Sequence, residues 1–127
     1  MDALLNLLAR ILMSQIFIVS GFGKITGYAG TQQYMQAAGV PGFLLPIVIL
    51  VELGGGLALL FGVKARWAAL LLAGFSLASA LLFHLHPGDQ MQMINFMKNL
   101  AMAGGLLMVT RHGAGRPSLD HRLERSP

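Results

Sequence analysis

The amino-acid sequence predicts an all-α protein, an integral membrane bundle of four transmembrane helices, on three observations. Of its 127 residues, 55% are hydrophobic and 11% are charged, whereas soluble domains carry about a quarter charged residues. Its apolar runs, roughly 17 to 20 residues each, approach the length at which a helix crosses the hydrocarbon core. Runs that are apolar on every side offer no polar face to water, which argues against a soluble bundle. The runs are residues 3–22, 43–62, 67–83 and 93–109.

The first run is predicted to be a retained transmembrane helix and not a cleaved signal peptide. It is preceded by Asp2 where a signal peptide has a basic segment, and its only early cation is Arg10. No clear Ala-x-Ala cleavage site follows it. The second run carries one carboxylate, Glu52, near its centre.

Residues 24–42 form the longest connection, which we expect on the outer side of the membrane. Thr31 is expected to cap a short helix over residues 32–38, with Gly39 as its stop and Pro41 soon after. The favoured interpretation is a helix that lies on the membrane surface. The alternative is a lid over the outer mouth of the bundle.

The remaining connections are shorter. The turn at residues 63–66 is tight, so the second and third helices are expected to be antiparallel neighbours. The third run is followed by His84 and His86, but the chain has no cysteine and only Asp89 lies nearby, so no metal site is predicted. We assign residues 1–111 to the transmembrane domain and residues 112–127 to a polar, disordered cytoplasmic tail.

Basic residues set the predicted orientation. Lys64 and Arg66 lie in the turn between the second and third runs, and more arginines follow the fourth, whereas the other two connections hold only Lys24. Cations collect on the cytoplasmic side, so both termini are predicted to be cytoplasmic. The basic residues are not clustered as a nucleic-acid face requires, so no nucleic-acid partner is expected.

Glu52 needs a partner, because an ionised carboxylate in the middle of a membrane is costly. Its candidate partners are Arg10 and Lys98, with His84 and Lys24 near the outer face. Side chains three or four residues apart share a helix face, so a cluster of Arg10, Glu52 and Lys98 is feasible. Two cations beside one anion would leave room for an external anionic or polar ligand. The structural alternative is an ion pair that only fixes helix register.

Glycines lie on the same helix faces as these polar residues. Small residues let helices approach closely in lipid, so we expect glycines to pack against neighbouring helices. The stripe of Gly54, Ala58 and Gly62 could equally serve a homo-oligomer. The glycines assigned to helix packing are Gly21, Gly54, Gly55, Gly56, Gly104 and Gly105.

Three segments resemble the DoxX family of small four-helix membrane proteins, above all its bacterial inner-membrane members. They are ARILMSQIFIVSGFGKITGYAGTQQYM (9–35), GVPGFLLPIVILVELGGGLALLFG (39–62) and FMKNLAMAGGLLM (96–108). With LLFH ending at His84, the resemblance covers nearly all of the chain except the tail. The residues that carry it are Gly21 and Lys24, Glu52 with the glycines after it, and Phe96, Lys98 and Asn99 with Gly104 and Gly105.

The resemblance implies a multi-pass protein of the bacterial inner membrane with a connection to redox chemistry. The family takes its name from a membrane subunit associated with quinone-linked sulfur oxidation, and other members are described as parts of oxidoreductase complexes concerned with thiol or oxidative stress. Without cysteines, this chain would need a quinone, a bound cofactor or a redox partner protein for any electron transfer.

The leading hypothesis is therefore an accessory membrane subunit of a quinone-linked redox process. A cavity with Arg10, Glu52 and Lys98 would bind the quinone head, Glu52 would carry protons, and His84 would pass them to the outer surface. Lys24 and Asn99 complete the set of ligand-binding or proton-handling candidates. The alternatives are a carrier or binding protein for a small amphipathic or anionic molecule, and a membrane scaffold without a ligand.

Overall fold

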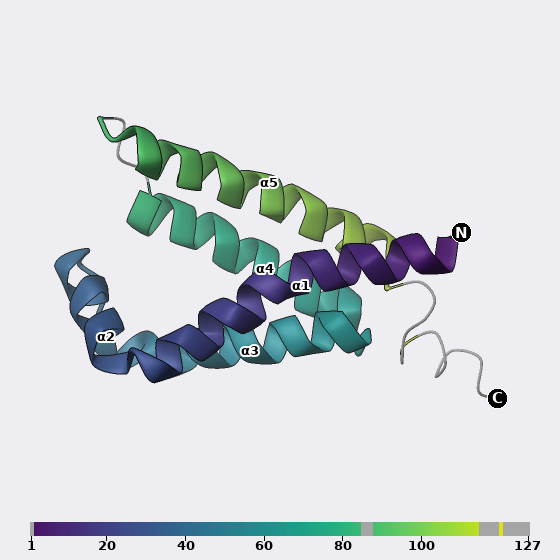
Figure 1. The fold of residues 1–127 in the computed structure, drawn as a ribbon, viewed down its shortest axis with the longest axis horizontal. Coiled ribbons are helices and arrows are strands. Elements are labelled where there is room, and N and C mark those ends of the chain that lie inside the picture. The colour runs from purple at the N-terminus through teal and green to yellow at the C-terminus, as the bar shows by residue number, and fades with distance from the viewer. Residues whose placement is uncertain (1, 85–87, 115–119, 121–127) are drawn as a thin grey trace.

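The structure, a computed structural model, describes residues 2–84, 88–114 and 120, and these residues form helices joined by short connections (Figure 1). Within them, 4 helices are long and apolar enough to span a membrane: Asp2–Thr26, Gly42–Phe61, Ala65–His84 and Gln90–His112. The predicted all-α, four-span fold is therefore confirmed. The elements are α1 (Asp2–Thr26), α2 (Tyr28–Ala37), the short 3-10 helix η1 (Gly42–Leu44), α3 (Leu45–Phe61), α4 (Ala65–Ser79), the π-helical turn η2 (Ala80–His84) and α5 (Gln90–His112).

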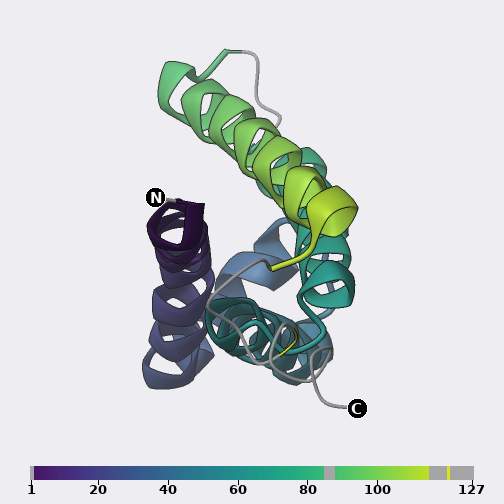
Figure 2. The ribbon, with the colours of Figure 1, turned by 90° about the vertical axis from the view of Figure 1, so that its right-hand side faces the viewer.

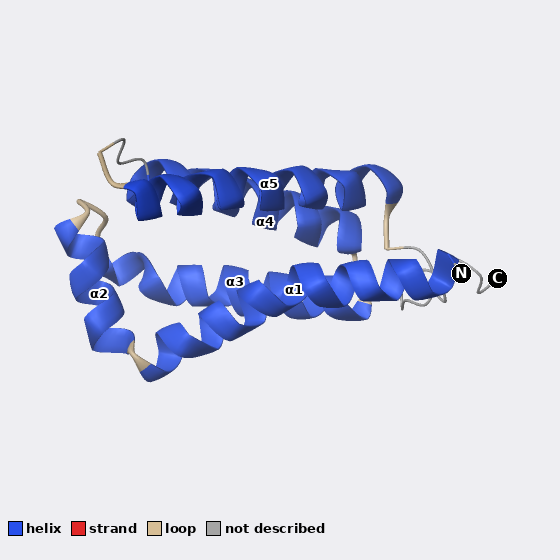
Figure 3. Cartoon of the chain, turned by 45° about the horizontal axis from the view of Figure 1, so that its top comes forward, coloured by secondary structure: helices blue, strands red, loops and turns tan. Residues whose placement is uncertain are grey.

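The spans are arranged as two antiparallel helix pairs. α1 packs along α3, α4 packs along α5, and α3 joins the pairs by packing on α4. α1 begins and α5 ends at the same end of the bundle, here called the Asp2 end, and α2 lies at the opposite end, here called the α2 end (Figures 1 and 3). In the described residues α1 and α5 touch over a short stretch only, and their ribbons diverge toward the α2 end (Figure 1).

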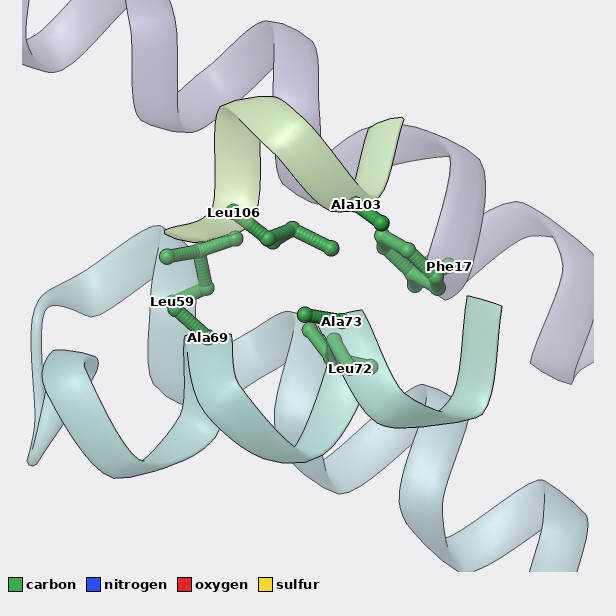
Figure 4. Close-up of a cluster of buried hydrophobic side chains, with 7 residues drawn as sticks. All are labelled: Phe17, Leu59, Ala69, Leu72, Ala73, Ala103 and Leu106. Carbon is green, nitrogen blue, oxygen red and sulfur yellow. The ribbon is translucent and has the colours of Figure 1, made fainter. Parts of the chain in front are cut away.

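The apolar core lies between the spans in the half of the bundle nearer the Asp2 end. Figure 4 shows its buried side chains pointing toward one another from four helices. Viewed from the Asp2 end, the four spans surround this region (Figure 2). The core consists of Phe17 from α1, Leu59 from α3, Ala69, Leu72 and Ala73 from α4, and Ala103 and Leu106 from α5.

Glycines bring the helix backbones together at several crossings. A Cβ built on Gly21 would lie 2.8 Å from Leu53 Cγ on α3, and one on Gly56 would lie 2.9 Å from Ile18 Cγ1 on α1. Gly55 is in the same way covered by Leu72 of α4, and Gly105 by Met13 of α1. Gly21 and Gly56 therefore lie where a neighbouring helix leaves no room for a side chain, whereas at Gly55 and Gly105 the side chains of Leu72 and Met13 would have to shift.

The packing role expected inside the bundle does not apply to Gly54 and Gly104. Both are exposed. A Cβ on Gly54 would meet only Leu50 of its own helix, and one on Gly104 would have nothing within 4 Å among the described residues. Their helical phase places them on outward faces, away from the neighbours that cover Gly55 and Gly105.

α2 begins one turn earlier than the sequence predicts. Thr31 lies inside the helix, and its hydroxyl donates to the carbonyl oxygen of Gly27, 2.9 Å away. A hydroxyl that bonds to the preceding turn in this way does not cap the helix start, so the predicted N-cap at Thr31 is wrong. The stop is correct, because Gly39 follows the helix with a φ of 84°.

The described residues after α5 make contacts that the prediction of a disordered tail did not include. Asp120 docks on the turn between α3 and α4, where its carboxylate accepts hydrogen bonds from the backbone N–H groups of Lys64 (2.6 Å) and Ala65 (2.7 Å). It therefore caps the start of α4. His112, the first residue assigned to that tail, ends α5, and residues 115–119 and 121–127 of the tail lie outside the described residues.

Candidate functional site

A cavity of about 550 Å³ lies in the half of the bundle toward α2. Ligand sites commonly measure about 300–1,000 Å³ and are mostly apolar with a few polar groups. The walls come from all four spans and from α2, and most of them are apolar. The polar side chains in its walls include Lys24 on α1, Glu52 on α3, Ser76 on α4, His84 on η2 and Asn99 on α5.

Glu52 is ion-paired inside this cavity with Lys24. Glu52 Oε1 lies 2.6 Å from Lys24 Nζ, with 4% of the Glu52 side chain exposed and 26% of the Lys24 side chain. The pairing follows from the crossing of α1 and α3: a Cβ on Gly21 would lie 3.2 Å from Glu52 Cβ, and Lys24 is one turn further along the same face. Lys24 also donates to the Ser20 hydroxyl at 2.6 Å.

Ser76 and Asn99 place further polar groups on the opposite wall. Asn99 Nδ2 donates to the backbone carbonyl oxygen of Ser76 at 3.2 Å, which ties α5 to α4. Ser76 is 1% exposed, and its hydroxyl has no hydrogen-bond partner within the described part of the chain. A buried polar group without a partner is costly, and Ser76 is among the residues that line the cavity.

His84 ends the third span at the rim of the cavity. Its Nδ1 lies 2.7 Å from Gln92 Oε1 of α5. The five residues Ala80–His84 form a π-helical turn, and such turns often occur at functional sites. His86, the other histidine considered from the sequence, lies outside the described residues.

α2 closes the cavity at its end. Tyr34 stacks on Phe83 of η2 with ring centroids 5.5 Å apart, and Met35 is buried with 4% of its surface exposed. Gln32 Nε2 donates to the carbonyl oxygen of Gly42 at 3.2 Å, which fastens α2 to the start of the second span. α2 thus covers a cavity, as the lid alternative proposed, and this geometry disfavours the plain surface helix.

The cluster of Arg10, Glu52 and Lys98 does not form. Arg10 is buried near the Asp2 end, where its Nη1 donates to the carbonyl oxygen of Leu60 at 2.9 Å. That carbonyl belongs to the last turn of α3, where helix carbonyls lack partners within the helix. Lys98 is exposed on α5. Arg10 lies too far toward the Asp2 end and Lys98 is exposed on α5, so Lys24 is the candidate cation that meets Glu52.

Sequence reasoning did not assign several side chains to the site. Ser20 binds the Lys24 amine, Ser76 contributes a free hydroxyl, Gln92 binds His84, and Tyr34 roofs the cavity. Ser20 precedes Lys24 by four residues, so helical spacing could have identified it. The contacts of Tyr34 and Gln92 join separate elements, and no spacing within one element signals them.

The cavity-bearing part of the chain also matches a known family. The model of the DoxX family matches residues 5–85, which include the first three spans and α2. The chain belongs to the DoxX family. The DoxX resemblance seen in the sequence is thereby confirmed.

Relatives in the family place it in a membrane. The chain is 56% identical over 119 residues to the inner membrane protein YqjF of Escherichia coli (strain K12), covering 94% of this chain and 92% of that protein. It is 38% identical over 125 residues to the inner membrane protein YphA of the same organism, covering 93% of this chain and 89% of that protein. These relatives and the four spans establish this DoxX protein as a bacterial inner-membrane protein.

A more distant relative has a name that suggests chemistry. Over 68 residues the chain is 36% identical to a Bacillus subtilis (strain 168) protein named "Putative oxidoreductase CatD", covering 54% of this chain and 51% of that protein. No solved structure matches the chain.

Proposed function

We propose that this DoxX protein is an accessory membrane subunit of a quinone-linked redox process, and that its cavity holds the quinone head. The observation that carries the proposal is the Lys24–Glu52 ion pair in the wall of a mostly apolar cavity. An ion pair with a packing role alone has no need of an adjoining cavity. Ionisable residues within membrane spans commonly mark ligand or proton paths.

The chemistry of the walls suits a quinone. Its carbonyl oxygens accept hydrogen bonds, and the Lys24 ammonium and the unpartnered Ser76 hydroxyl are donors on two sides of the cavity. Its ring is flat and apolar on both faces, like the surfaces offered by Tyr34, Phe83 and Phe17. The isoprenoid tail of a quinone is apolar, so it requires only an apolar path out of the cavity.

Glu52 is the proposed proton carrier. When a quinol is oxidised to a quinone, two electrons and two protons leave it, and a carboxylate beside a hydroxyl can accept a proton. The electrons would pass to a partner protein, since the chain has no cysteine to take them. The oxidoreductase label in the name of CatD and the quinone association of the family support this assignment.

The test is the content of lipid-soluble molecules in protein purified gently from native membranes. Wild type is expected to carry a quinone in near-stoichiometric amount, and Glu52→Gln to lose it while remaining inserted and folded. Asp2→Asn is the matched control, because it neutralises an exposed carboxylate outside the cavity. Only bulk phospholipid in all three preparations would reject the proposal. Counterflow of an anionic solute in proteoliposomes would favour the carrier hypothesis instead.

A further inference from the structure

The four spans form a ring in which one seam is closed over part of its length only. Around the ring, α1 packs on α3, α3 on α4, and α4 on α5. The remaining seam, between α5 and α1, is closed where Met13 lies on Gly105, since a Cβ on Gly105 would collide with Met13 Cε. Phe17 and Ala103 of the core lie close to this contact.

Beyond that contact, toward the α2 end, both helices line the cavity. Ser20 and Lys24 of α1 and Asn99 and Met102 of α5 belong to its walls. Over the same stretch the α1 and α5 ribbons diverge in both side views (Figures 1 and 3). The seam between α1 and α5 is therefore the one with the fewest contacts between neighbouring spans in the described residues, and α2 covers the end of the cavity.

Lys98 lies beside this seam. Met102, one turn later on α5, lines the cavity, and Gly105, about two turns later, meets α1. Residues at this spacing share a helix face, so Lys98 occupies the flank of α5 that is turned toward α1. It is exposed and lies about 12 Å along α5 from Gln90 by the helical rise. An exposed cation at that depth is costly and calls for a polar partner.

We propose that the ligand enters sideways from the bilayer through the opening between α1 and α5, and that Lys98 on its rim engages the polar head during passage. This inference rests on the proposed function, and the expected ligand is a lipid-soluble molecule with an oxygen-bearing head, such as a quinone. A molecule already dissolved in the bilayer can then reach the cavity directly. It need not leave the bilayer for water and enter at the α2 end. Lys98 gives its head a polar contact before it reaches Lys24, Ser76 and Glu52.

An entrance has a kinetic signature that differs from that of a binding contact. Blocking the entrance slows association and dissociation equally and leaves the dissociation constant unchanged, whereas removing a contact inside the cavity changes the constant itself. Because the chain has no cysteine, a pair of introduced cysteines can be linked without side reactions. Counting ten residues from Met13 along α1 and about ten back from Gly105 along α5 selects Gly23 and Ile94, both exposed.

The experiment links Gly23→Cys and Ile94→Cys with a reducible bis-maleimide and follows binding of a short-chain ubiquinone by rapid mixing. Linking is expected to slow both rates about tenfold with little change in the dissociation constant, and reduction of the linker to restore them. The single-cysteine variants treated in the same way are the controls. A second variant, Gly23→Trp, narrows the opening without a crosslink, since a Cβ there meets nothing within 4 Å, and should slow both rates too.

Lys98→Gln is expected to slow both rates, and Lys98→Arg to leave them near wild type. Unchanged rates in both the linked protein and Gly23→Trp would overturn the side entrance, even though binding itself persisted. Efficient crosslinking of single Ile94→Cys chains into dimers would also overturn it, because a second copy would then cover the seam. Absence of ubiquinone binding to untreated wild-type protein would refute the proposed function instead.

Discussion

At the scale of single residues, Lys24 and Glu52 hold together the halves of α1 and α3 that lie toward the α2 end. Their separation of 2.6 Å and the low exposure of Glu52 place the carboxylate inside the bundle, in the wall of the cavity. Loss of one partner would leave a buried charge without its counter-charge, which is more damaging than loss of both.

A double-mutant cycle measures this pair. Lys24→Met should lower the free energy of unfolding in detergent by about 1–3 kcal/mol, because Glu52 loses its cation. Combining it with Glu52→Gln should recover part of that loss, since no charge then remains buried. Strictly additive effects of the two changes would contradict a stabilising pair.

The sequence identifies Glu52 as the residue in need of a partner but does not select the partner. Helical spacing shows which side chains share one face of one helix, and Arg10, Lys24 and Lys98 all satisfied that condition. The choice depends on where α1 crosses α3. That crossing is set by Gly21 against Leu53 and Glu52, a contact between residues far apart in the chain.

At the scale of elements, the side of the helix on which each glycine lies decides which helix faces can pack together. Gly55 and Gly56 face α4 and α1, while Gly54 faces outward on the same helix. The sequence shows a run of small residues, but only the positions of the neighbouring helices distinguish the packed members from the exposed one.

Gly56→Ala and Gly54→Ala form a matched test of this distinction. The new methyl at position 56 would meet Ile18 Cγ1 at 2.9 Å and the Ile18 backbone nitrogen at 3.3 Å, so it should destabilise the protein by about 1–3 kcal/mol. The same change at position 54 should be neutral or stabilise by about 0.5–1 kcal/mol through helix propensity. Thermal unfolding in one detergent compares them, and equal effects would contradict the assigned packing.

The start of α4 depends on a residue more than fifty positions away. Asp120→Ala removes the carboxylate that accepts from Lys64 and Ala65 N–H and should cost about 0.5–2 kcal/mol, as loss of an N-cap does. Hydrogen exchange at the first amides of α4 should accelerate. Asp120→Asn keeps one acceptor oxygen and should be milder, and unchanged exchange in Asp120→Ala would contradict the cap.

At the scale of the whole molecule, the four-span architecture follows from composition and run length, and the structure reproduces it. Helix ends were less predictable. α1 continues to Thr26 and α5 begins at Gln90, beyond the apolar runs, because polar residues can extend a helix whose backbone bonds are already formed. A cavity in the bundle was expected, but its position and walls were beyond sequence reasoning, since they arise from the separation of helices and not from a motif.

Orientation remains a prediction that can be measured directly. Because the chain lacks cysteine, single cysteines report sidedness clearly. Gly30→Cys on α2, where a Cβ meets nothing within 4 Å, should react with an impermeant maleimide from outside the inner membrane. A cysteine appended after Pro127 should react only after permeabilisation. The reverse pattern would overturn the cytoplasmic assignment of both termini.

The π-helical turn at Ala80–His84 has a consequence for how such proteins can diverge. A π-turn holds one residue more than an α-helical path between the same ends. Deleting Leu81 would therefore convert the turn to α-helix without changing the path between its ends, so Phe83 would keep its contact with Tyr34 and His84 its contact with Gln92. The loss of a single codon there would shorten the span by one residue in one evolutionary step, without redesign of the roof of the cavity.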